Sequence, residues 1–187
     1  MQSPLFFIAK PEQGKRYNNT VDWDGIDIIT STSEEDHKFS NRRAEVMEVP
    51  VGYDGPIKIG DTLLVHHNVF KYYNDMRGRR KSGKSFFKDD LFFIDTEQFF
   101  MWHDGESWNA HDRYCFVSPV ETEDSFIYKP FSEEPLMGVM EYPNKYLLGQ
   151  GVTKGTKVSF CPDSEYEFEV DDKKMYRIYD HQITLKL

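Results

Sequence analysis

Cysteine is scarce in this 187-residue sequence, which contains only Cys115 and Cys161. Two cysteines are too few for a disulfide framework or a thiolate metal cluster. Long apolar runs are also absent, and residues 1–4 lack the basic and apolar regions that begin a signal peptide. We therefore expect a soluble, cytoplasmic protein with no membrane contact.

Basic residues are too few to balance the acidic ones. The chain has 23 Lys and Arg against 32 Asp and Glu, a net charge of −9. This charge repels phosphate and argues against a surface that binds nucleic acid as a whole, although it leaves room for a local basic patch. A hydrophobic content of 39%, with 16% aromatic residues, is enough for a folded core.

Helical periodicity is nearly absent as well. Apolar residues come in short runs rich in β-branched and aromatic side chains, bounded by Gly, Pro, Asn and Asp, which is the signature of strands. The expected strands are 5–9, 44–49, 62–70, 91–94, 99–102, 114–117, 136–141, 157–161, 166–170, 175–179 and 183–187. The sequence therefore predicts an all-β protein.

The sequence also repeats itself. Residues 91–101 align with 175–185 without a gap, 7–12 resemble 115–120, and 57–65 resemble 152–160. This self-similarity predicts two β units in tandem, residues 1–105 and 110–187.

The intervals between landmarks locate two insertions in the first unit. Pro11 and Gly60 are 49 positions apart, against 36 for Pro119 and Gly155, and a second excess lies between Gly60 and Gln98. We expect a long loop at 18–43 and a basic insert at 71–88. New functions tend to arise in such loops, because lengthening a loop costs little free energy of folding.

The order of these landmarks resembles the GroES-type co-chaperonin family. The residues that carry the resemblance are 5–11 (LFFIAKP), 24–30 (DGIDIIT), 44–49 (AEVMEV) and 57–65 (IKIGDTLLV), with 138–140, 154–158, 166–170 and 176–178 in the second unit. The resemblance implies two tandem, partly open GroES-like β-barrels with long loops in the first. The sequence departs from the family at the roof hairpin, since the corresponding segments, 52–56 and 144–151, are short.

The resemblance also implies a function. A co-chaperonin forms a homo-oligomeric ring that caps an ATP-driven, GroEL-type chaperonin ring and assists protein folding. The ATP chemistry would belong to the partner, so no cofactor and no enzyme activity are expected here. The residues that match the chaperonin-binding segment are Gly25, Ile26, Ile28 and Ile29, and the shorter loop of the second unit offers Phe126, Ile127 and Tyr128 as a secondary contact.

The composition of the first loop supports a docking role independently of the resemblance. Its isoleucines stand among acidic residues, and an apolar cluster in a polar loop suits a groove on a partner. The alternative is that residues 26–29 form one more core strand. The main functional alternative is a structural or virion-assembly protein that uses a GroES-like barrel for ring or surface packing.

The insert at 71–88 carries a basic patch. Its central cations are Arg77, Arg79, Arg80, Lys81 and Lys84. Residues 78–85 fit the phosphate-loop pattern, but a strand rather than a helix is expected after Lys84, so we do not expect nucleotide binding. A solvated hairpin tip, or contact with an acidic neighbouring copy, is favoured over single-stranded nucleic acid.

No other residues suggest chemistry. His66 and His67 are adjacent, so on a strand they should face opposite ways and cannot chelate one ion together. No metal site is expected, and no Ser, His and Asp set suggests a catalytic triad.

Overall fold

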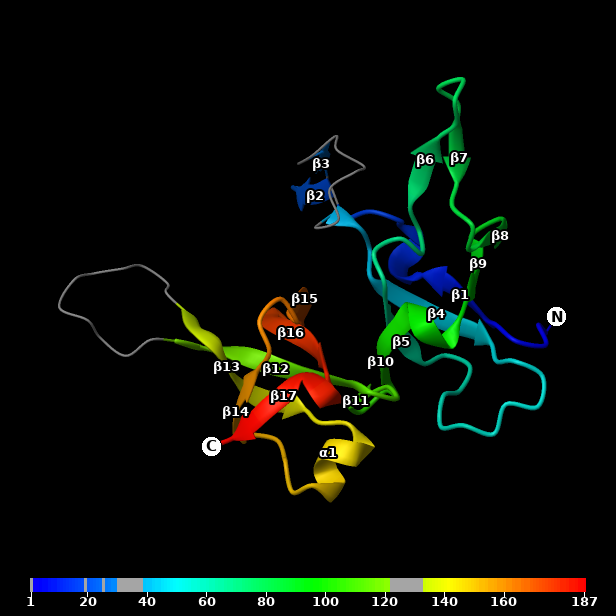
Figure 1. Ribbon diagram of the computed structural model, residues 1–187. Helices are drawn as coiled ribbons and strands as arrows, with labels where there is room; N and C mark the ends of the chain where they lie inside the picture. Colours follow the sequence, from blue (N-terminus) through cyan, green and yellow to red (C-terminus); the bar gives the residue numbers. More distant parts are fainter. Residues whose placement is uncertain (1, 19, 25, 30–38, 122–132) are drawn as a thin grey trace. The chain divides into compact units, whose positions relative to one another are not determined.

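The computed structural model describes residues 2–18, 20–24, 26–29, 39–121 and 133–187 (Figure 1). The regular structure of the described residues is almost entirely β-strand, with one short α-helix, which confirms the all-β prediction. The chain divides into two compact units, Met1–Ser107 (unit 1) and Trp108–Leu187 (unit 2).

Unit 1 is built on one antiparallel sheet and two separate hairpins. The sheet strands of this unit are hydrogen-bonded in the order β10-β5-β4-β1-β9-β8, while β2–β3 and β6–β7 each form a two-stranded sheet. The elements are β1 (Phe7–Pro11), η1 (Glu12–Gly14), β2 (Thr20–Trp23), β3 (Ile26–Ile29), β4 (Arg43–Glu48), β5 (Thr62–Val65), β6 (Tyr72–Asn74), β7 (Arg80–Ser82), β8 (Phe86–Lys88), β9 (Leu91–Ile94), η3 (Thr96–Gln98) and β10 (Phe99–His103).

Unit 2 has one antiparallel sheet in the order β15-β16-β12-β13-β14-β17. The elements are β11 (Trp108–Ala110), β12 (Tyr114–Glu121), β13 (Glu133–Tyr142), α1 (Lys145–Gly149), β14 (Lys157–Phe160), β15 (Tyr166–Val170), β16 (Lys173–Tyr179), η4 (Asp180–Gln182) and β17 (Ile183–Lys186). The helix α1 lies in the segment expected to form a shortened roof hairpin, where Asn144 caps the helix by accepting a hydrogen bond from the Leu147 N–H.

The two sheets have the same topology. Strands β1, β4, β5, β8, β9 and β10 correspond in chain order and pairing to β12, β13, β14, β15, β16 and β17. The equivalence extends to single residues: the register shifts between Ile8 and Ala9 opposite β4, and between Phe116 and Val117 opposite β13. Because bulges fix local twist and register, a bulge at the same position in both sheets indicates that the two units repeat one structure.

The turns repeat too. The Gly60 N–H donates to the Val46 carbonyl, and the Gly155 N–H donates to the Met140 carbonyl. Both glycines have positive φ, 94° and 85°, a conformation that side chains with a Cβ rarely adopt. The internal sequence alignment therefore reflects repeated backbone geometry.

Each unit has its own hydrophobic core. In unit 1, Phe7 packs edge-to-face on Phe99, and Phe70 packs in the same way on Phe92, all four being buried. The core of unit 2 includes Met140, Val158, Phe160 and Ile178. Inward-facing residues alternate with more exposed ones along β4 and β9, as period-two patterning requires.

The sheets are open. Within the described residues, the strands at the two ends of each sheet are not hydrogen-bonded to each other, so neither sheet closes into a barrel. The two tandem GroES-like barrels therefore stay a prediction.

Candidate functional site

The apolar segment of the first loop lies in a hairpin of its own. Strands β2 and β3 pair with Val21 opposite Ile28 and Trp23 opposite Ile26. Within the described residues, the hairpin is a separate two-stranded sheet rather than a member of the main sheet. Asp24 at its turn has a φ of 54°, which Asp tolerates better than most residues.

Among the isoleucines of this segment, Ile28 is the one whose exposure the structure describes. Its side chain is 46% exposed. An isoleucine this exposed is available to a partner. Gly25 and the side chains of Ile26 and Ile29 lie outside the described part of the structure. The sequence signal for the hairpin was the Asp-Gly pair between apolar residues, a strong indicator of a two-residue turn.

The loop leaves unit 1 through a closed stem. The Asn18 N–H donates to the Phe39 carbonyl and the Asn41 N–H donates to the Arg16 carbonyl, at 2.7 and 3.0 Å. The buried Asn41 side chain also donates to the carbonyls of Glu12 and Lys15 and accepts from the Arg43 N–H. Both ends of the loop are thereby held at fixed positions.

The corresponding loop of unit 2 also has an anchored stem. Glu121 pairs with Glu133 where β12 and β13 begin to part. The Glu133 carboxylate accepts hydrogen bonds from the Tyr176 hydroxyl and from Lys174 Nζ. Phe126, Ile127 and Tyr128, the expected secondary contact, lie outside the described residues.

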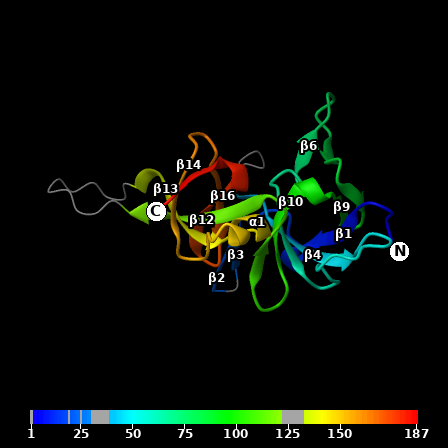
Figure 2. The same cartoon turned by 60° about the horizontal axis from the view of Figure 1, so that its bottom comes forward.

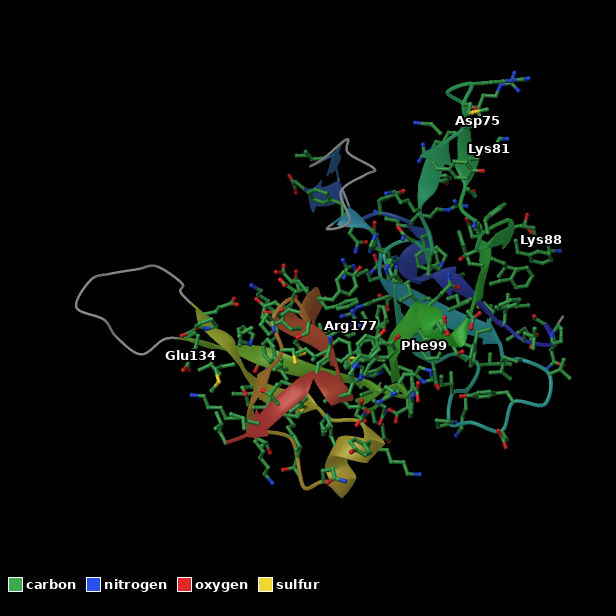
Figure 3. The ribbon with its side chains drawn as sticks, viewed as in Figure 1. Asp75, Lys81, Lys88, Phe99, Glu134 and Arg177 are labelled. Carbon is green, nitrogen blue, oxygen red and sulfur yellow. The ribbon has the colours of Figure 1, made fainter. Side chains whose placement is uncertain are left out.

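The basic insert forms the β6–β7 hairpin, which extends away from the sheet strands of unit 1 in both views (Figures 1 and 2). Asp75 organises its tip: one carboxylate oxygen accepts from the N–H groups of Arg77 and Arg79, and the other lies 3.4 Å from Lys81 Nζ (Figure 3). These contacts lower the pKa of Asp75, the Arg79 N–H having the largest effect. Gly78 completes the turn with a φ of 72°.

Aromatic rings hold the base of this hairpin. The guanidinium of Arg80 lies 3.8 Å from the centre of the Tyr72 ring, and that of Arg16 lies 4.2 Å from it. Arg16 also donates to Ser82 Oγ, and the Tyr72 N–H donates to the Tyr17 hydroxyl. Cation–π contacts and hydrogen bonds thus join the hairpin to the body of unit 1.

The phosphate-loop pattern at 78–85 does not have the geometry of a phosphate site. Residues 80–82 form β7, and the exposed Lys84 lies in a turn that leads into β8 rather than into a helix. Without a helix, the row of amide groups that would face a phosphate does not form.

The prediction that the side chains of His66 and His67 face opposite ways is wrong. The rings of His66 and His67 lie 4.1 Å apart with an angle of 31° between their planes, so they do not face opposite ways. The reason is that β5 ends at Val65, and strand alternation no longer applies beyond it. Among the described residues, no group of three or more His, Cys, Asp or Glu side chains is placed to hold a metal ion.

Unit 2 contains a surface pocket of about 690 Å³ between α1, η4 and the turn before β12. Its buried carboxylate, Asp180, accepts hydrogen bonds from Asn144 Nδ2 at 3.1 Å and Arg113 Nη2 at 3.3 Å. The Asn144 amide also donates to the Asp112 carbonyl. These hydrogen bonds join the N-cap of α1 to η4 and to the turn before β12, which gives the polar groups of the pocket a structural role.

The thiol of Cys115 is buried in the core of unit 2, where burial raises its pKa to about 12. A thiol held protonated in this way is a poor nucleophile. In the described part of the chain, no helix has the length and apolar character of a membrane span.

No family model matches the chain, and no curated protein matches it either.

Proposed function

We propose that this protein is a co-chaperonin, a ring-forming lid that acts in the cytoplasm on an ATP-driven chaperonin ring of the GroEL type. The observation that carries the proposal is the β2–β3 hairpin, which lies apart from the main sheet and presents Ile28 from an anchored stem. In this role the protein is not an enzyme, and the ATP chemistry belongs to the chaperonin.

The energetics suit a contact that must form and break. Burying an isoleucine contributes about 1.5–3 kcal/mol, whereas ordering one loop residue costs about 1–2 kcal/mol. The pairing of β2 with β3 reduces the number of residues left to order. One hairpin still binds weakly, but a ring that presents several hairpins at once binds through effective concentration.

The experiment is a capping assay. The full chain is mixed with a GroEL-type chaperonin with and without ATP, and complex formation is followed by sedimentation. We expect an ATP-dependent complex. The absence of any complex, together with stable self-assembly of the chain, would favour the structural or virion-assembly alternative.

Replacing Ile28 by Ser tests the contact itself. Ile28 is partly exposed, so the change should alter the free energy of unfolding by no more than about 0.5 kcal/mol. It should nevertheless abolish capping, because a small loss recurs at every hairpin of the ring. Unfolding in urea and the capping assay measure the two effects.

Ile59→Ser is the matched control, since Ile59 is 59% exposed in unit 1 but lies outside the loop. This variant should cap normally. A fall of several degrees in the melting temperature of Ile28→Ser would instead identify Ile28 as a core residue.

A further inference from the structure

The β6–β7 insert concentrates positive charge on an acidic protein. Residues 71–88 contain seven basic side chains and one acidic one, a net charge of +6, so the remainder of the chain carries −15. The cations at the tip, Arg77 and Arg79, are exposed. An anionic partner is therefore expected, and the rest of this molecule is itself strongly anionic.

The hairpin favours a protein partner over single-stranded nucleic acid. Bases bind such patches by stacking on several aromatic faces, but the Tyr72 ring is already covered by Arg80 and Arg16, which leaves Tyr73 as the exposed tyrosine of β6. The tip also presents Met76 fully exposed, a flexible apolar side chain suited to a protein surface. The hydrogen bonds to Asp75 hold this tip in a defined turn.

The complementary surface lies on unit 2. The strand β15 stands at the end of its sheet, where one backbone edge faces away from β16. Glu165, Glu167 and Glu169 alternate with the more buried Tyr166 and Phe168, so the three carboxylates share the exposed face. Residues 163–174 contain six acidic and two basic side chains, a net charge of −4.

We propose that the β6–β7 hairpin of one copy docks on the acidic β15 edge of a second copy. The two surfaces lie on different units, so the contact is heterologous and links copies head to tail, as a ring requires. This inference rests on the self-association included in the proposed function, but not on chaperonin capping. Charge complementarity should make the contact sensitive to salt, since exposed charges are screened beyond about 10 Å at 0.1 M ionic strength.

The test uses charge reversal in the full chain. The hairpin variant is Arg77→Glu with Arg79→Glu, which spares Arg80 at the aromatic base. The edge variant is Glu165→Lys with Glu169→Lys, which spares Glu167 because its carboxylate lies 3.4 Å from Lys174 Nζ. Self-association is measured by analytical ultracentrifugation at low and high salt.

Each variant alone should weaken self-association at least tenfold at low salt. An equimolar mixture of the two should recover it, because the acidic hairpin of one variant then meets the basic edge of the other. The chain that carries all four changes should also associate. Lys58→Glu with Lys145→Glu, both exposed, is the matched control for net charge and should associate like the unmodified chain.

Three outcomes would overturn the proposal. Unchanged association of both variants excludes these surfaces from the interface. Recovery in the four-change chain but not in the mixture places the contact within one chain. Saturable binding of a single-stranded oligonucleotide, lost in the hairpin variant while association is unchanged, identifies nucleic acid as the occupant.

Discussion

Asn41 is the residue that closes the stem of the first loop. Its side chain is 4% exposed and makes three hydrogen bonds to backbone groups, two as donor and one as acceptor. Removing one member of a buried hydrogen-bond set costs more than the bonds contribute, because the remaining groups lose their partners.

Asn41→Ala should therefore destabilise the protein by about 1–3 kcal/mol. Urea unfolding followed by fluorescence measures the change. Asn74→Ala, at an exposed position in β6, serves as the control and should stay within about 0.5 kcal/mol. An equally small effect at Asn41 would show that the stem does not depend on this side chain.

Glu133 gives the second stem a dependence on pH. Burial raises the pKa of Glu133, but the hydrogen bonds from Lys174 and Tyr176 outweigh that effect, so the pKa lies below its usual value. A carboxyl group with a lowered pKa in the folded state stabilises the fold above its unfolded pKa, about 4.3. That stabilisation is lost as the pH falls through the folded pKa.

Glu133→Gln should therefore be less stable than the unmodified chain at pH 7, and the difference should close as the pH falls below about 4. Chemical unfolding at a series of pH values measures the difference. If the difference in the free energy of unfolding were unchanged at pH 3, the ionised form of Glu133 would not be its cause.

At the scale of elements, the 3₁₀ turns η3 and η4 are closed by the same type of glutamine hydrogen bond. Gln98 Oε1 accepts from the Asp95 N–H at 3.0 Å, and Gln182 Oε1 accepts from the Tyr179 N–H at 3.1 Å. Gln98 makes a further hydrogen bond, donating to Ser85 Oγ. The turn that leads into the last strand is thus fixed in the same way in both units.

Gln98→Ala and Gln182→Ala should each cost about 0.5–1.5 kcal/mol per hydrogen bond removed, with the larger loss at Gln98. Thermal unfolding of the two variants measures this order. A larger loss at Gln182 would show that the additional hydrogen bond from Gln98 to Ser85 does not stabilise the fold.

Prediction from sequence succeeded where buried residues alternate with more exposed ones. The ranges 91–94 and 166–170 match β9 and β15 at both ends, because alternation with buried partners fixes their register. The short hairpins β2–β3 and β6–β7 were not among the expected strands, although a strand at 26–29 and a hairpin tip in the basic insert were considered as alternatives. Strands β6 and β7 are three residues long and mostly exposed, and the apolar residues of β2 and β3 stand in an acidic loop, so neither hairpin shows the apolar run of a core strand.

The candidate functional site could be predicted from the sequence only in part. The exposure of Ile28 depends on β3 pairing with β2 rather than with the main sheet, and periodicity does not distinguish these cases. The helix α1 was missed because it spans five residues, too few to show a helical period. The acidic face of β15 was visible as Glu alternating with apolar residues, but its position at a sheet edge required the topology.

At the scale of the whole molecule, the equivalent strands β10 and β17 differ in exposure. Phe99 and Met101 of β10 are fully buried, whereas Leu185 of β17, which corresponds to Met101, is 60% exposed. The strand β17 also stands at the end of its sheet. An exposed apolar edge strand tends to pair with another chain, so β17 is expected to meet a neighbouring copy.

Deleting residues 183–187 should then give monomers at concentrations where the full chain associates. Sedimentation velocity measures the mass. Because the deletion also removes the partner of β14, Leu185→Lys provides a milder test that keeps the strand. Retention of the full oligomer by Leu185→Lys and by the deletion variant, with both folded, would exclude this edge.

Shared topology leaves a folding chain with two interchangeable sets of strands, and tandem copies of one sheet are prone to strand exchange. Side-chain size discourages the wrong pairing of β12 with β4. A Cβ at Gly138 would lie 2.8 Å from Val117 Cγ2, so β12 needs glycine at this place in its neighbour. The equivalent residue of β4 is Ala44, which has such a Cβ, whereas β1 places the smaller Ala9 at the position of Val117. The glycine at position 138 thus directs β12 to β13 rather than to β4.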